Sequence, residues 1–93
     1  MPFAVINTVR IENVDQSREA LLGEVVPNVK KAPGFVNGVW AADRDKGRGV
    51  GIVVFESREQ AEEVVRRLAS GELKRPAGVT VEDVAVYEVQ AQA

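Results

Sequence analysis

The alternation of apolar and polar positions along the chain predicts four strands. Residues 3 to 11 are rich in β-branched and aromatic side chains, which suit a largely buried strand. Residues 35 to 43 and 48 to 56 have the same character and flank the polar turn Asp43-Arg44-Asp45-Lys46-Gly47, which predicts a β-hairpin. A fourth strand is expected over residues 79 to 89, where acidic and aliphatic residues alternate.

A helical spacing of apolar residues predicts a first helix over residues 16 to 31. Its apolar positions are Ala20, Leu21, Val25, Val29 and Ala32. Asp15 or Ser17 is the expected N-cap. Pro27 lacks an amide hydrogen and crowds the carbonyl of Gly23, so we expect a kink or a broken turn in this helix.

A second helix is predicted between the third and fourth strands. The sequence Ser57-Arg58-Glu59-Gln60 matches a capping box, in which the serine oxygen accepts from the Gln60 amide and the Gln60 side chain reaches back. One apolar stripe follows, and Gly71 is the expected C-terminal cap. The stripe consists of Ala61, Val64, Val65, Leu68 and Ala69. Beyond it a loop is expected that contains Pro76 and Gly78.

The element order βαββαβ predicts the fold. It gives an α+β domain of the ferredoxin-like type, in which a four-stranded antiparallel sheet carries both helices on one face. At 93 residues, we expect one such domain over residues 1 to 93.

The uncovered face of this sheet is predicted to be apolar. Alternation along the third strand directs Gly51, Val53 and Phe55 toward the helices and three aliphatic residues outward, and two valines of the fourth strand are expected to join them. An exposed apolar sheet face usually marks an interface, so we expect a homodimer that pairs two such faces. The predicted interface residues are Val50, Ile52, Val54, Val84 and Val86.

Composition limits the chemistry that the chain can perform. It contains neither cysteine nor histidine, which removes thiolate nucleophiles, sulfur-ligated metals and the commonest general base, so no metal and no cofactor are expected. The absence of cysteine favours a reducing compartment, and a cytoplasmic location is the default expectation. No apolar stretch approaches the length of a membrane span, and no signal peptide is recognisable at the start.

Nucleic acid is an unfavourable partner for this chain. Twelve basic and fourteen acidic residues give a net charge of −2, which provides no general attraction for phosphates. The third strand, from Arg48 to Phe55, does resemble the first ribonucleoprotein signature of RNA-recognition motifs. However, Val50 and Ile52 stand where that motif has base-stacking aromatic residues, and Ala4 replaces the stacking residue of the first strand.

Several short motifs resemble the dimeric α+β barrel superfamily, and within it the small antibiotic-biosynthesis monooxygenases. They cover nearly the whole chain: Val25-Val26-Pro27, Ala32-Pro33-Gly34-Phe35-Val36, Val54-Phe55-Glu56-Ser57 and Val86-Tyr87-Glu88-Val89. The resemblance implies dimerisation through the open sheets and an apolar or aromatic ligand between sheet and helices. In some members it also implies oxidation of that ligand by molecular oxygen without metal or flavin. Haem-degrading members supply a histidine ligand, which this chain lacks.

The resemblance also indicates candidate site residues by type and strand position. The cofactor-free oxygenases use asparagine, tryptophan, tyrosine and arginine side chains, which makes Asn7, Trp40 and Tyr87 the candidates for catalysis and Arg10 and Asn37 the candidates for ligand binding. Each has a structural alternative. Asn7 can tie down a neighbouring loop, Trp40 can fill core volume, and Tyr87 can lie at the rim of an interface. A non-catalytic ligand-binding or assembly module therefore stays open beside the oxygenase.

Overall fold

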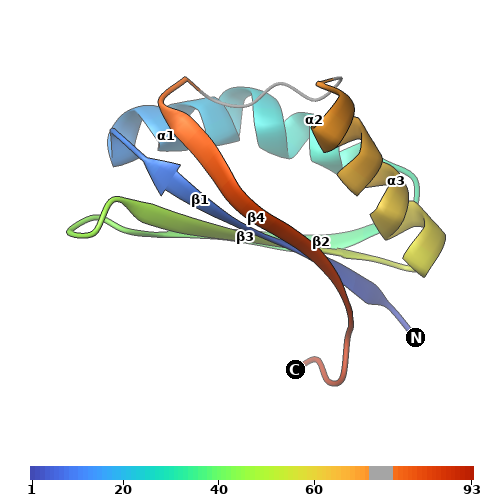
Figure 1. Cartoon of the computed structure of the whole chain (residues 1–93). Coiled ribbons are helices and arrows are strands. Elements are labelled where there is room, and N and C mark those ends of the chain that lie inside the picture. The colour runs from blue at the N-terminus through green and yellow to red at the C-terminus, as the bar shows by residue number, and fades with distance from the viewer. Residues whose placement is uncertain (72–76) are drawn as a thin grey trace.

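The computed structural model describes residues 1–71 and 77–93, and these form a four-stranded antiparallel sheet with helices on one face. Figure 1 shows the helices above the sheet and its other face uncovered. The strand order is β2-β3-β1-β4. The predicted α+β, βαββαβ fold is confirmed. The elements are β1 (Phe3–Ile11), α1 (Val14–Ala20), η1 (Leu21–Val25), α2 (Val26–Lys30), β2 (Phe35–Asp43), β3 (Arg48–Phe55), α3 (Arg58–Ser70) and β4 (Val79–Glu88).

The first helix begins two residues earlier than predicted. Asn13 is its N-cap, and the Asn13 side chain accepts a hydrogen bond of 3.0 Å from the Gln16 amide. The expectation that Asp15 or Ser17 caps the helix was wrong, because both residues already lie in its first turn. Ser17 is buried there, and Asp15 places a negative charge close to the positive end of the helix dipole.

The interruption expected near Pro27 takes the form of a π-helical turn. Within η1 the amide of Val26 donates to the carbonyl of Leu21, five residues back, and α2 resumes with Pro27 in its first turn. Proline is tolerated at the start of a helix because its missing amide hydrogen would have no intrahelical partner there. Widening the preceding turn therefore lets the chain pass Pro27 without ending the helix.

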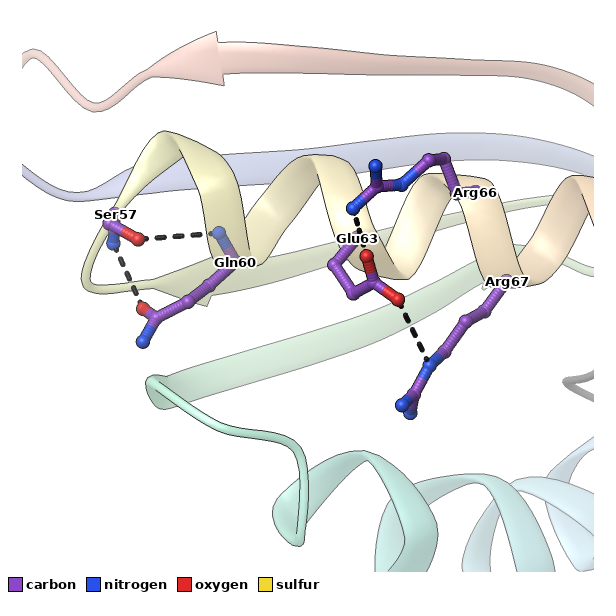
Figure 2. A network of polar contacts seen from close by, with 5 residues as sticks. All are labelled: Ser57, Gln60, Glu63, Arg66 and Arg67. Atoms are coloured by element: carbon purple, nitrogen blue, oxygen red, sulfur yellow. Dashed lines mark hydrogen bonds and ion pairs between the residues drawn. The ribbon is translucent and has the colours of Figure 1, made fainter.

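The second predicted helix, α3, has both of its predicted ends. Ser57 and Gln60 form the reciprocal capping box, with bonds of 3.3 and 3.2 Å, and Gly71 closes the helix in the left-handed conformation at φ 83°. Figure 2 shows the capping box and, one turn further on, Glu63 between Arg66 and Arg67. Local sequence alone therefore determines where this helix begins and ends. The predicted Pro76 loop lies outside the described residues.

The core lies between the sheet and α3. Its buried members are Val5, Val53, Phe55 and Ala61, of which Phe55 and Ala61 are fully enclosed, and Phe35 meets Phe55 edge to face with ring centroids 6.5 Å apart. Because Val53 and Phe55 point toward the helices, alternation turns Val50, Ile52 and Val54 to the open face, as predicted.

Two of the predicted interface residues lie on the helix-covered face instead. Val84 is paired with Asn7 and Val86 with Val5, and both valines pack against the core. The assignment of Val84 and Val86 to the open face was therefore wrong. A bulge in β4 opposite Thr8 and Val9 inserts one residue, so Val79 and Val81 share the helix-covered face with Val84 and Val86 although their parity in the sequence differs. On the open face β4 presents Ala85 and Tyr87.

Candidate functional site

Two adjoining cavities of about 660 and 440 Å³ lie between the sheet and the first helix. Both volumes fall in the range of small-molecule sites. Asn7, Trp40, Val25 and Leu68 line both cavities, so these residues mark where they adjoin. Most of the remaining wall of the larger cavity is aliphatic, with contributions from Val9, Ile11, Leu21, Val26, Val79 and Val81.

Strand register brings Asn7 and Trp40 together. Gly51 of β3 is paired with Asn7 on one side and with Trp40 on the other, so the three residues form one row across the sheet on its helix-covered face. A Cβ atom on Gly51 would overlap Oδ1 of Asn7 and would stand 3.0 and 3.1 Å from Cδ1 and Nε1 of Trp40. The asparagine amide and the indole N–H edge therefore converge over Gly51.

The indole of Trp40 lies across two glycines. Its five-membered ring is next to Gly51, whereas Cη2 of its six-membered ring is 2.8 Å from the point where a Cβ on Gly38 would stand. A side chain at either position would displace the ring. Gly38 and Gly51 thus allow a large flat side chain to lie close to the sheet and leave the space beneath the helix open.

The side-chain polar groups of Asn7 and Trp40 form no hydrogen bond with any residue that the structure describes. The Asn7 amide and the Trp40 indole N–H have no hydrogen-bond partner among residues 1–71 and 77–93. The structural alternative for Asn7, a bond to a neighbouring loop, is therefore not observed. An amide and an indole N–H in an apolar cavity are suited to bind an oxygen atom of a ligand.

The far end of the larger cavity is basic. Arg18 and Arg44 both line it, and Arg44 forms an ion pair of 3.0 Å with Asp15 that ties the hairpin tip to α1. The hydrogen bond from Arg44, followed by its charge, lowers the pKa of Asp15, and the same contact raises the pKa of Arg44. Arg18 has no ion-pair partner in the described ranges.

The other three candidate residues lie apart from this pair, on the open face of the sheet. Tyr87 is paired with Ala4 and is 54% exposed, and Arg10 forms an ion pair of 3.3 Å with Glu82. Asn37 is exposed beside a β-bulge, opposite Val54. Within one chain, therefore, only Asn7 and Trp40 of the five candidates reach the cavity.

The same open face carries the exposed apolar residues of the sheet. Val39 is 61% and Ile52 38% exposed, and they are direct neighbours, with Ile6 next in the row. Tyr87 lies toward the other end of this face. No helix covers this face (Figure 1), and its apolar residues around Val39 and Ile52 are exposed in the single chain, whereas Val54 and Ala4 on the same face are buried.

Sequence reasoning missed the basic end of the cavity. Arg18 was one of several charged residues on a predicted helix, and nothing local to it indicates a cavity. The sequence Gly38-x-Trp40 did carry a signal, since small residues two positions from a tryptophan leave room for a flat ring. In the residues that the structure describes, no group of carboxylates suited to a metal ion occurs and no helix is long and apolar enough to cross a membrane.

No protein-family model matches the chain, and no curated protein matches it in sequence. Solved structures do match, and they define the class: the chain has the fold of the antibiotic-biosynthesis monooxygenases over nearly its whole length, as the sequence motifs suggested. SnoaB, a cofactor-independent oxygenase from Streptomyces nogalater, superposes with TM-scores of 0.69 and 0.67 in two structures. It is 15% identical, and the match covers 98% of this chain and 95% of SnoaB.

Two further structures show the same likeness. The monooxygenase ActVA-Orf6 of Streptomyces coelicolor, in complex with nanaomycin D, has a TM-score of 0.60 and 16% identity, covering 98% of this chain and 89% of that one. Rv0793 from Mycobacterium tuberculosis is 24% identical with a TM-score of 0.59, covering 100% and 99% of the two chains. At these identities the likeness establishes the fold.

Proposed function

We propose that this protein is a homodimer that binds a flat, largely apolar ligand between its sheet and helices and oxidises it with molecular oxygen, without a cofactor. The observation that carries the proposal is the convergence of the Asn7 amide and the Trp40 indole N–H over Gly51, in an apolar cavity and without protein partners. The description of SnoaB as a cofactor-independent oxygenase and the complex of the monooxygenase ActVA-Orf6 with nanaomycin D support the same function.

The chemistry requires a substrate that forms a stabilised carbanion. In an anthrone, the CH₂ group between two aryl rings loses a proton, and the resulting carbanion transfers electron density to oxygen and forms a C–O bond. The hydroperoxide then loses water and leaves a ketone, so that one oxygen atom enters the quinone and the other leaves as water. The indole N–H of Trp40 would donate a hydrogen bond to the oxygen atom on which negative charge develops, and Asn7, whose Oδ1 lies over Gly51, would donate to the same atom through its amide NH₂ group.

The residues that line the cavity restrict the substrate to compounds whose C–H group loses a proton without the help of a strong base. The chain has no histidine, and the charged residues lining the cavities in the described ranges are Glu24, Arg18 and Arg44. Glu24 is exposed to water, so the described cavity walls offer no buried carboxylate that could act as a base. A substrate whose carbanion is delocalised over aromatic rings and a carbonyl does not need a strong base. The proposal is therefore restricted to activated aromatic compounds.

Oxygen uptake with anthrone tests the catalytic part. We expect uptake and anthraquinone formation above the rate in buffer, and a decrease of roughly 100-fold in the enzymatic rate for the double variant Asn7→Ala, Trp40→Phe, because two donors to the developing anion are lost. Arg66→Gln, a change on the outer surface of α3, is the control. If the double variant retained the full rate, Asn7 and Trp40 would have no catalytic role.

The exposed row formed by Val39, Ile52 and Ile6 supports the homodimer. Light scattering across a dilution series should give the mass of a dimer, and Ile52→Asp should give a monomer with unchanged circular dichroism, because a charge buried between two sheets without a partner is strongly unfavourable. A wild-type monomer at all concentrations would contradict this part of the proposal.

The lack of a buried base in the described cavity walls favours one alternative, a protein that binds its ligand without converting it. This alternative predicts that anthraquinone derivatives raise the melting temperature, whereas anthrone is not oxidised faster than in buffer. The oxygen-uptake experiment separates the two functions.

A further inference from the structure

Resting on the proposed function, we infer that the ligand carries a carboxylate at the end remote from the reacting carbon, and that Arg18 is the residue that selects it. The larger cavity has two chemically different ends joined by an aliphatic wall. One end holds the neutral polar groups of Asn7 and Trp40, and the other is lined by Arg18 and Arg44. A ligand that fills this cavity therefore meets hydrogen-bond donors at one end and positive charge at the other.

Strand geometry gives the separation of these ends. Asn7 and Ile11 both line the cavity from β1, four residues apart, which corresponds to about 13 Å along the strand. Arg44 follows β2 directly, at the end of the sheet where Asp43 is paired with Arg48 and Arg48 with Arg10. The basic end thus lies beside Ile11, and a ligand of three fused rings directs an acidic substituent toward this end when its long axis runs along β1.

Arg18 and Arg44 differ in whether a carboxylate of the protein already pairs with them. Arg44 is held by Asp15 at 3.0 Å, and that carboxylate cancels one of the two positive charges. Arg18 has no ion-pair partner in the described parts of the chain. The net charge of this group of three residues is therefore positive by one, which matches a single carboxylate. The charge of Arg18 also lowers the pKa of Asp15, but Arg18 forms no ion pair with it, so Arg18 is the cation available to pair with the ligand.

Titration with two matched probes tests this inference. Anthraquinone-2-carboxylate and anthraquinone-2-carboxamide have nearly the same shape and differ in charge, and Trp40 is the only tryptophan, so its fluorescence reports occupation of the cavity. We expect the carboxylate to bind about three- to fivefold more tightly than the amide, a factor typical of a solvent-exposed ion pair. We expect Arg18→Gln to remove this preference and to leave binding of the amide unchanged. High salt should reduce the preference as well.

Arg66→Gln changes the net charge equally at a site on the outer surface of α3 and should retain the preference. Equal binding of both probes by the wild-type protein, or an equal effect of Arg18→Gln and Arg66→Gln, would overturn the assignment of Arg18 while cavity binding stands. If neither probe changed Trp40 fluorescence or the melting temperature, both this inference and the proposed ligand site would fail.

Discussion

Replacing Gly51 by alanine is the substitution that most directly perturbs the arrangement of Asn7 and Trp40. The new Cβ atom would overlap Oδ1 of Asn7 and crowd the five-membered ring of Trp40 at 3.0 Å. The backbone at Gly51 does not adopt a positive φ, so alanine introduces no backbone strain and the effect arises from these contacts alone.

Two opposing contributions determine how far Gly51→Ala changes the free energy of unfolding. Overpacking a position of this kind costs about 1 to 3 kcal/mol. Loss of glycine flexibility in the unfolded chain offsets about 0.4 to 1 kcal/mol of this cost. The net expectation is a decrease of about 1 to 2 kcal/mol in the free energy of unfolding. For a domain of this size, that decrease lowers the melting temperature by about 4 to 16 °C.

A double-mutant cycle assigns the effect to Asn7. We expect Gly51→Ala to be less destabilising in an Asn7→Ala background, with a coupling of about 1 kcal/mol, because the overlapping oxygen is then absent. Urea unfolding of the four proteins gives the four free energies. The same cost of Gly51→Ala in both backgrounds would refute the placement of Asn7 over Gly51.

Three further substitutions test other parts of the structure. Ser57→Ala should reduce the free energy of unfolding by about 1 kcal/mol in urea titrations, since it removes the capping box of α3, and an unchanged value would contradict that role. Gly23→Ala should raise the free energy of unfolding by about 0.5 to 1 kcal/mol, because an added Cβ meets nothing within 4 Å and alanine favours a helix more than glycine does. A lower free energy of unfolding would mean that the π-turn requires glycine. Arg44 lowers the pKa of Asp15, so their ion pair stabilises the fold above the ordinary pKa of 3.8 and is lost as the pH falls below it. The melting temperature of Asp15→Asn should therefore lie slightly below that of the wild type at neutral pH, and the difference should shrink as the pH falls below the ordinary pKa of 3.8; a difference that persisted unchanged in strong acid would refute this account.

Features encoded locally were predictable from the sequence. The capping box at Ser57, the stop at Gly71 and the hairpin turn depend on residues a few positions apart, and the structure has all of them. In the hairpin turn, the Asp43 carboxylate accepts from the amides of Asp45 and Lys46, which is the local bonding that favours aspartate in turns.

The faces of β4 were not predictable from simple alternation. The bulge changes the parity between Val81 and Val84, and bulges depend on the pairing partner as much as on the strand itself. One signal was available: two Val-x-Val segments separated by Glu82-Asp83 fit the same buried face if one residue is inserted between them. With Val86 on the helix-covered face, Tyr87 points to the open face, so it cannot reach the cavity together with Asn7 in the same chain.

The cavity could be predicted only in part, because it depends on tertiary arrangement. Asn7 and Trp40 were candidates by residue type, but their meeting over Gly51 follows from the strand register, which the sequence does not specify on its own. The basic end requires α1 to lie against the hairpin tip, where Asp15 meets Arg44. These contacts join residues that are far apart in the sequence.

The most direct test of the account is a nuclear magnetic resonance titration that follows the Trp40 indole N–H and the Asn7 side-chain amide while anthraquinone-2-carboxylate is added. The chain has one tryptophan, so its indole signal is unambiguous. We predict that both signals shift along the same saturation curve, whereas the signals of Ile52 and Tyr87 on the open face do not follow it. Shifts confined to Ile52 and Tyr87, with Trp40 and Asn7 unchanged, would place the ligand on the open face of the sheet instead of in the cavity and would contradict the account.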